Sequence, residues 1–90
     1  MKTIFITGGS TGIGRATVRK FVGEGWNVAF VDINTEDGER LAQELGEKVL
    51  FARADTRNRS EVEAAVEAAV ARFGGIYSVF TNAGIHRFNT

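Results

Sequence analysis

Hydrophobic residues are arranged along the chain in two alternating patterns. Short runs are almost continuously apolar and rich in β-branched or aromatic residues, whereas the segments between them place apolar residues three or four positions apart. The first pattern is typical of a strand buried on both faces of a sheet, and the second of a helix with one buried face. The runs predict four strands, at Thr3 to Thr7, Asn27 to Asp32, Lys48 to Ala54 and Ile76 to Thr81.

The segments between these runs predict three helices. The first two are expected at Ile13 to Glu24 and Glu36 to Leu45. A third helix is expected to start at a capping box formed by Ser60 and Glu63 and to stop at Gly74. The order βαβαβαβ, with short connections, favours parallel strands joined by right-handed crossovers. We therefore expect a single α/β domain, residues 1–90, built on a doubly wound parallel sheet.

Composition excludes several classes of protein. Of the 90 residues, 43% are hydrophobic and 24% charged, which is ordinary for a globular domain. Eleven basic residues balance eleven acidic ones, so no overall charge attracts nucleic acid or an anionic membrane. There is no cysteine, and no apolar segment approaches the roughly 18 residues of a membrane span. The apolar stretch at the N-terminus is too short for a signal peptide, so we expect a cytoplasmic protein.

Glycines are concentrated where the first strand meets the first helix, in the segment TGGSTGIG from Thr7 to Gly14. The first amides of a helix lack partners within the helix, and the helix dipole adds partial positive charge there. Because missing side chains let a phosphate approach these amides, the segment predicts a pyrophosphate site. The alternative is that the glycines only make a tight turn, for which one or two would suffice.

The neighbouring residues argue against a nucleoside triphosphate. Gly9 to Gly14 has the spacing of a P-loop, but Arg15 and Ala16 stand where that motif requires Lys and Ser or Thr. A P-loop hydrolase would reveal itself by Mg²⁺-dependent binding of ATP. The simple G-x-G-x-x-G fingerprint is also incomplete, because its last position is Thr17.

Asp32 ends the second predicted strand, eighteen residues after Gly14. A carboxylate at about this separation accepts hydrogen bonds from the adenosine ribose of a dinucleotide. Because it would repel a 2′-phosphate, NAD is favoured over NADP, and the uncharged Thr11 does not reverse this preference. The alternative role for Asp32 is that of a helix cap or turn residue.

Four motifs together resemble the short-chain dehydrogenase/reductase family. Thr7 to Gly14 is similar to the family's T-G-x-x-x-G-x-G cofactor motif, and Asp32 stands where NAD-preferring members keep an acidic residue. Ala54-Asp55 resembles the segment whose Asp contacts the adenine ring, and Thr81 to Gly84 resembles N-N-A-G. The motifs occur in the family's order and cover essentially the whole chain.

The resemblance implies a Rossmann-like sheet in the strand order 3-2-1-4 and NAD(H) as the cofactor. In the family, hydride passes between the nicotinamide and an alcohol or carbonyl carbon. The residues that the resemblance assigns to cofactor binding are Gly8, Ser10, Thr11, Gly12, Ile13, Gly14, Asp32, Ile33, Ala54, Asp55, Thr56, Asn82, Ala83 and Gly84.

The chain departs from the family pattern in two respects. Thr81 replaces the first Asn of N-N-A-G, and Tyr77 occupies a position that is often Asp. Family members also continue through an active-site Asn, a Ser and a Tyr-x-x-x-Lys, none of which can be placed here. Tyr77 is the only tyrosine, and Thr81 lies four residues after it. We therefore expect the N-terminal part of a dinucleotide-binding domain, with no catalytic residues and little or no turnover alone.

The expected strand order leaves the fourth strand at an edge, where apolar strand and part of one sheet face are exposed. We therefore expect self-association, as a dimer or a larger assembly. A second hypothesis is a non-catalytic module, ordered by this self-association, that binds no cofactor.

The remaining polar and aromatic residues have simpler interpretations. His86, the only histidine, is interpreted as a loop residue, and no metal site is expected. Arg53, Arg57 and Arg59 could contact a phosphate, but the acidic neighbours Asp55 and Glu61 offset them, so they are interpreted as solvated charges. Trp26 is interpreted as a packing residue.

Overall fold

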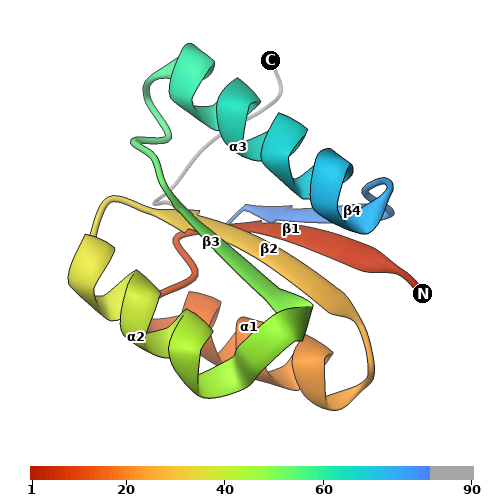
Figure 1. Ribbon diagram of the computed structural model, residues 1–90. Coiled ribbons are helices and arrows are strands. Elements are labelled where there is room, and N and C mark those ends of the chain that lie inside the picture. Colours follow the sequence, from red (N-terminus) through yellow and green to blue (C-terminus); the bar gives the residue numbers. More distant parts are fainter. Residues whose placement is uncertain (82–90) are drawn as a thin grey trace.

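Four parallel strands in the order β3-β2-β1-β4 form the centre of the molecule (Figure 1). A computed structural model describes residues 1–81. The predicted parallel sheet and the strand order 3-2-1-4 are confirmed. The strands are β1 (Thr3–Thr7), β2 (Asn27–Asp32), β3 (Val49–Arg53) and β4 (Ser78–Thr81).

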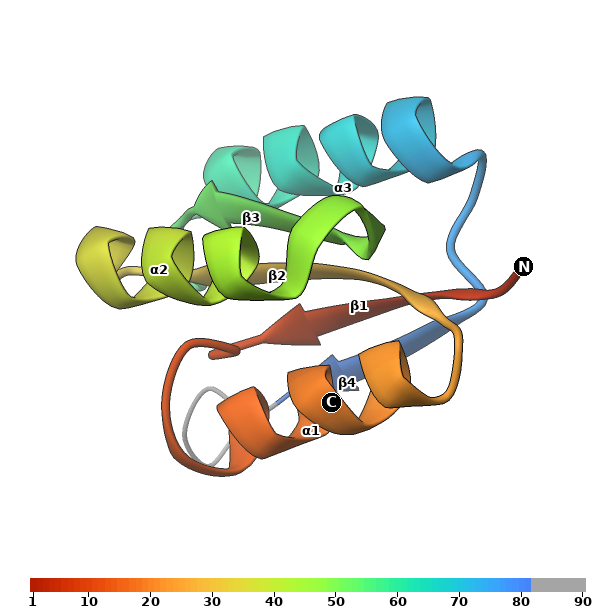
Figure 2. The same cartoon turned by 60° about the horizontal axis from the view of Figure 1, so that its bottom comes forward.

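Three α-helices cover the sheet in two layers. Figure 2 shows α1 (Gly12–Gly23) and α2 (Thr35–Leu45) on one face and α3 (Arg59–Phe73) on the other. A short 3-10 turn, η1 (Gly46–Lys48), leads into β3. None of the helices in residues 1–81 has the length and apolar composition needed to cross a membrane.

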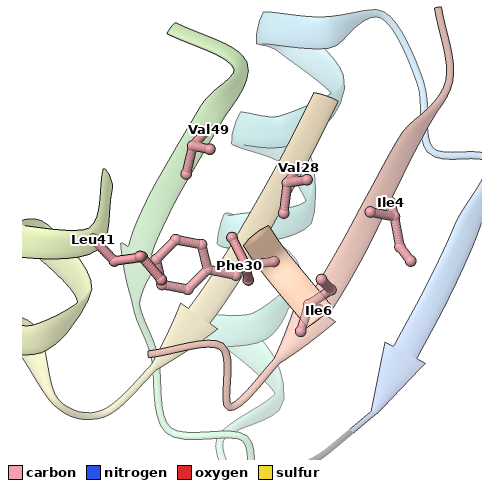
Figure 3. Close-up of a cluster of buried hydrophobic side chains, with 7 residues drawn as sticks. Ile4, Ile6, Val28, Phe30, Leu41 and Val49 are labelled. Atoms are coloured by element: carbon pink, nitrogen blue, oxygen red, sulfur yellow. The ribbon is translucent and has the colours of Figure 1, made fainter. Parts of the chain in front are cut away.

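The apolar runs of the strands are buried between these layers. Because neighbouring strands are parallel and in register, alternate residues face α1 and α2 or face α3. Figure 3 shows the first cluster, in which Phe30 reaches toward Leu41 of α2. The buried residues of this cluster are Ile4, Ile6, Val18, Val28, Phe30, Leu41 and Val49. Those of the opposite cluster are Phe5, Ala29, Val31, Ala54, Ala65 and Ala69.

The predicted start of the third helix is wrong by two residues. Asn58, and not Ser60, is the N-cap of α3, because its side-chain oxygen accepts a hydrogen bond from the amide of Glu61 at 3.2 Å. Asn is as good a cap as Ser and comes earlier in the chain, so the helix begins there. The Ser60 hydroxyl instead donates to the Asn58 side chain. The predicted end is confirmed, since Gly74 adopts a left-handed conformation with φ of 92°.

The first two strands have the predicted bounds, and the remaining boundaries agree with the predicted ones to within one or two residues. The third strand begins at Val49 because Gly46–Lys48 form the 3-10 turn, and the fourth begins at Ser78. Trp26 is confirmed as a packing residue. Its ring makes edge contacts with Phe21 and Tyr77, at centroid distances of 4.8 and 5.8 Å.

Candidate functional site

A hollow of about 350 Å³ lies where β1, β2 and β3 end. The carboxyl ends of these parallel strands meet at one edge of the sheet (Figure 1), the usual place for a ligand in this type of fold. The backbone of the β3 end is tied to β2, because the amide of Ala54 donates to the carbonyl of Asp32 at 3.1 Å. The residues that line the hollow are Gly8, Thr11, Asp32, Ile33, Ala54, Asp55, Thr56 and Arg57.

The glycine-rich turn between β1 and α1 lies against β2. The amides of Gly8 and Gly9 both donate to the carbonyl of Val31, at 2.8 and 3.2 Å. Gly8 and Gly12 have φ of 69° and 59°, which L side chains rarely adopt. A Cβ on Gly9 would lie 2.7 Å from the Cβ of Phe30, so Gly9 is required by packing. The glycines therefore both shape the turn and let it approach the core.

The N-terminus of α1 is left without a side-chain cap. Asn34 and Asn58 cap α2 and α3 through their side chains, whereas Thr11, the N-cap of α1, makes no such bond. Within residues 1–81, the amides of Gly12 to Gly14 have no hydrogen-bond acceptor. These amides can therefore donate hydrogen bonds to an anionic group beside the hollow, and the positive end of the helix dipole favours its charge.

Asp32 connects the glycine-rich turn to the end of β2. Its Oδ2 accepts hydrogen bonds from the amide and the hydroxyl of Ser10, at 3.1 and 2.5 Å, and its Oδ1 accepts one from the amide of Asn34 at 3.1 Å. Partial burial acts to raise the pKa of Asp32, but these bonds outweigh it and the net pKa is lowered. The carboxylate is therefore ionised at neutral pH at the rim of the hollow.

Asp32 therefore also acts as a turn residue, which is the alternative role that the sequence allowed for it. The cap of α2 is Asn34, whose side-chain oxygen accepts from the amide of Asp37 at 3.1 Å. The backbone amide of Ile33 also interacts with the Asp32 carboxylate and helps to lower its pKa.

Asp55, on the other side of the hollow, is fixed by Arg57. The amide and the Nε of Arg57 donate to Oδ1 of Asp55 at 2.9 and 3.1 Å, and its Nη2 donates to Oδ2 at 3.0 Å. These bonds lower the pKa of Asp55 to about 2. The backbone is held as well, because the Asp55 amide donates to Oε1 of Glu61 at 2.8 Å.

Arg57 also lines the hollow, although the sequence does not predict it there. It was interpreted as a solvated charge, and its side chain is indeed 82% exposed. The Asp-x-Arg spacing in a turn after a strand is the signal that points to the pairing, since residues two apart in such a turn can meet. Arg53 and Glu61 form a second ion pair nearby, at 3.3 Å.

The structure brings most of the predicted site residues together. Those that line the hollow are Gly8, Thr11, Asp32, Ile33, Ala54, Asp55 and Thr56. The other predicted residues that the structure describes lie beside it, with Ser10 buried against Asp32 and Gly12, Ile13 and Gly14 in the first turn of α1. Asn82, Ala83, Gly84 and His86 lie outside the described residues. Among residues 1–81 there is no group of His, Cys, Asp or Glu side chains that could hold a metal ion.

Comparison with known proteins places this arrangement in a family. The family model described as short chain dehydrogenase matches residues 2–90. The 2,5-dichloro-2,5-cyclohexadiene-1,4-diol dehydrogenase of Sphingobium indicum is 46% identical over 84 residues, which are 93% of this chain and 34% of that protein. The chain thus spans about a third of the length of the curated relatives that it matches.

Solved structures agree with the sequence comparison. The 3-ketoacyl-(acyl-carrier-protein) reductase of Brucella melitensis, solved in complex with NADH, has a TM-score of 0.84 and 36% identity over 87% of this chain and 32% of its own. A short-chain dehydrogenase/reductase of the same organism has a TM-score of 0.88 and 33% identity, over 96% of this chain and 36% of its own. With the family model matching nearly every residue, the chain belongs to the short chain dehydrogenase family.

Proposed function

We propose that this chain is the NAD-binding portion of a dehydrogenase that interconverts an alcohol and a carbonyl compound. The observation that carries the proposal is the uncapped N-terminus of α1 beside the ionised Asp32, at the rim of one hollow. The matched relatives include dehydrogenases, and one similar solved structure contains NADH. When bound, the nicotinamide ring would supply the carbon that accepts or donates hydride.

Each part of the adenosine diphosphate half of NAD has a candidate site. The amides of Gly12 to Gly14 would hold the pyrophosphate, because they lack acceptors within the described residues. Asp32 would accept from the ribose hydroxyls, and its charge would repel the 2′-phosphate of NADP. Ser10 would act through Asp32, since its amide and hydroxyl are both engaged with that carboxylate. The adenine would occupy the hollow between Ile33 and Asp55.

We assign residues 1–81 to cofactor binding alone. Tyr77, the only tyrosine of the chain, immediately precedes β4 and therefore lies near the amino ends of the strands. Its amide donates to the carbonyl of Thr3, the first residue of β1. The hollow is at the opposite, carboxyl ends, so Tyr77 is too remote to exchange a proton with a substrate there. We expect no turnover of alcohols or ketones that depends on Tyr77.

Binding of NAD is expected to stabilise the chain measurably. At 100 times its dissociation constant, a ligand that binds only the folded state adds about 2.7 kcal/mol to the free energy of unfolding. Thermal unfolding with millimolar NAD should therefore show a clear rise in melting temperature, with a smaller rise for NADP. Mg²⁺ and ATP serve as the control for a P-loop site and should give a smaller shift than NAD. A melting temperature that NAD leaves unchanged would contradict the proposal.

A second candidate function, self-association, has an observation of its own. Within residues 1–81, β4 is an edge strand that pairs with β1, and Val79 on it is 60% exposed. Val79 is in register with the buried Phe5, so it lies on the α3 face of the sheet. Pairing of a second copy along β4 would cover this apolar edge.

Self-association through β4 is tested by sedimentation velocity at tens of micromolar protein. We expect the wild-type chain to sediment as a dimer or larger, and Val79→Lys to sediment as a monomer, because a charge on an edge strand opposes pairing. Val70→Lys, at a 43% exposed position of α3, is the matched control and should associate as the wild type does. A wild-type chain that is monomeric at this concentration would rule out self-association.

A further inference from the structure

Arg57 restricts the orientation of the Asp55 carboxylate, which lines the part of the hollow where the adenine would bind. Oδ1 of Asp55 accepts two hydrogen bonds from Arg57, and Oδ2 accepts one. An ionised carboxylate oxygen accepts about two hydrogen bonds and donates none. Within the described residues, Oδ2 therefore keeps one position for a donor, whereas Oδ1 is filled. Both Asp55 and Arg57 line the hollow.

The other charged groups around Asp55 hold its backbone in place and do not compete for its side chain. Oε1 of Glu61 accepts from the amide of Asp55 and from Nη1 of Arg53, at 2.8 and 3.3 Å. The positive charge of Arg53 also favours the ionised form of Asp55. The orientation of the Asp55 carboxylate is therefore set by Arg57, and its position by Glu61.

Resting on the proposed function, we infer that Arg57 is the positioning residue that makes the base site selective for a 6-aminopurine. The geometry that carries this inference is the three hydrogen bonds from Arg57 to Asp55, which leave one acceptor position at the hollow. The amino group of adenine is a donor and can fill that position. The oxygen at the same place in hypoxanthine is an acceptor, and it would face a carboxylate that cannot donate to it.

The preference for adenine over hypoxanthine follows from the free-energy cost of a hydrogen bond that hypoxanthine cannot form. Hydrogen bonds to charged groups contribute more than those between neutral groups, and a buried acceptor without a donor is penalised further. We therefore expect NAD to bind about tenfold or more tightly than nicotinamide hypoxanthine dinucleotide. Arg57→Ala removes the two side-chain bonds and keeps only the backbone amide bond to Oδ1, so Oδ2 is no longer held in one direction. The preference should then fall to about threefold or less.

The test is isothermal titration calorimetry of the 90-residue chain with NAD and with nicotinamide hypoxanthine dinucleotide. It compares the wild type with Arg57→Ala and with Arg59→Ala. Arg59 is also exposed, lies at the first position of α3 and forms no ion pair within the described residues, so it controls for the loss of one positive charge. The wild type and Arg59→Ala should prefer NAD, and Arg57→Ala should lose most of this preference.

Nuclear magnetic resonance titration of the Asp55 carboxyl gives a second readout that needs no ligand. Its pKa should be about 2 in the wild type and should rise toward the ordinary 3.8 in Arg57→Ala, but not in Arg59→Ala. A wild-type chain that binds both dinucleotides equally, an Arg57→Ala variant that keeps the preference, or an unchanged Asp55 pKa would overturn the inference alone. A wild-type chain that binds neither dinucleotide would overturn the proposed function, and the inference with it.

Discussion

Replacing Gly9 with alanine is expected to lower the melting temperature by roughly 5 to 20 °C. The added Cβ would lie 2.7 Å from the Cβ of Phe30, which is 1% exposed and packed in the core. Overfilling a packed core costs about 1 to 3 kcal/mol, and each kcal/mol lowers the melting temperature of a domain of this size by about 4 to 8 °C. Thermal unfolding followed by circular dichroism measures the change.

Gly23→Ala is the matched control for this prediction. Gly23 is the last residue of α1, and a Cβ added there meets nothing within 4 Å. Alanine is a better helix former than glycine, so this variant should unfold at or above the wild-type temperature. Equal melting temperatures for the two variants would show that the turn does not approach β2 as closely as the structure places it.

Replacing Asp32 with asparagine is expected to shift the preference for NAD over NADP by about a hundredfold. Asn keeps the shape of the side chain but removes its charge. Hydrogen bonds from the ribose to a neutral oxygen are weaker by about 1 kcal/mol or more, and the repulsion of a 2′-phosphate, worth a similar or larger amount at short range, is lost. NAD should therefore bind more weakly and NADP more tightly. Calorimetric titration with each dinucleotide measures both changes.

A control for the loss of charge is available at the other end of the sheet. Glu47 is exposed in the 3-10 turn before β3, at the amino ends of the strands. Glu47→Gln should leave both dissociation constants unchanged. If Asp32→Asn also leaves the ratio of the two constants unchanged, Asp32 does not set the choice of cofactor.

The parallel sheet could be predicted because its strands and helices depend on patterns local to each element, and the resemblance added the strand order and most of the site residues. The apolar runs identify strands that are buried on both faces, such as Asn27–Asp32, and the connections are short enough to require parallel crossovers. Residues at the carboxyl ends of such strands must then meet at one edge. Asp32 could be placed at this edge from its spacing and its position at the end of a strand, whereas the place of Asp55 came from the resemblance; both line the same hollow.

The contacts that could not be predicted join residues far apart in the chain or depend on side-chain orientation. Ser10 and Asp32 are 22 residues apart, and their two hydrogen bonds follow from how the turn lies on β2. Gly9 belongs to the motif, but a side chain is excluded there because Phe30 of the neighbouring strand lies too close. The Asp-x-Arg spacing permits the pairing of Arg57 with Asp55, but the spacing alone does not fix the orientation of the guanidinium, which the structure shows on the Asp55 carboxylate.

The central claim is that the uncapped start of α1 and the carboxylate at the end of β2 together hold the adenosine diphosphate half of NAD. The most direct test is a ¹H–¹⁵N correlation spectrum of the chain titrated with NAD. The largest shifts are expected at the amides of Gly12 to Gly14, at Ile33 and at Asp55.

A second hollow, of about 420 Å³, lies along β3 and includes Gln43 and Leu50, and it provides the internal comparison. The amides around this second hollow should shift little or not at all. Shifts that gather around Gln43 and Leu50 while the first turn of α1 stays unchanged would contradict the account.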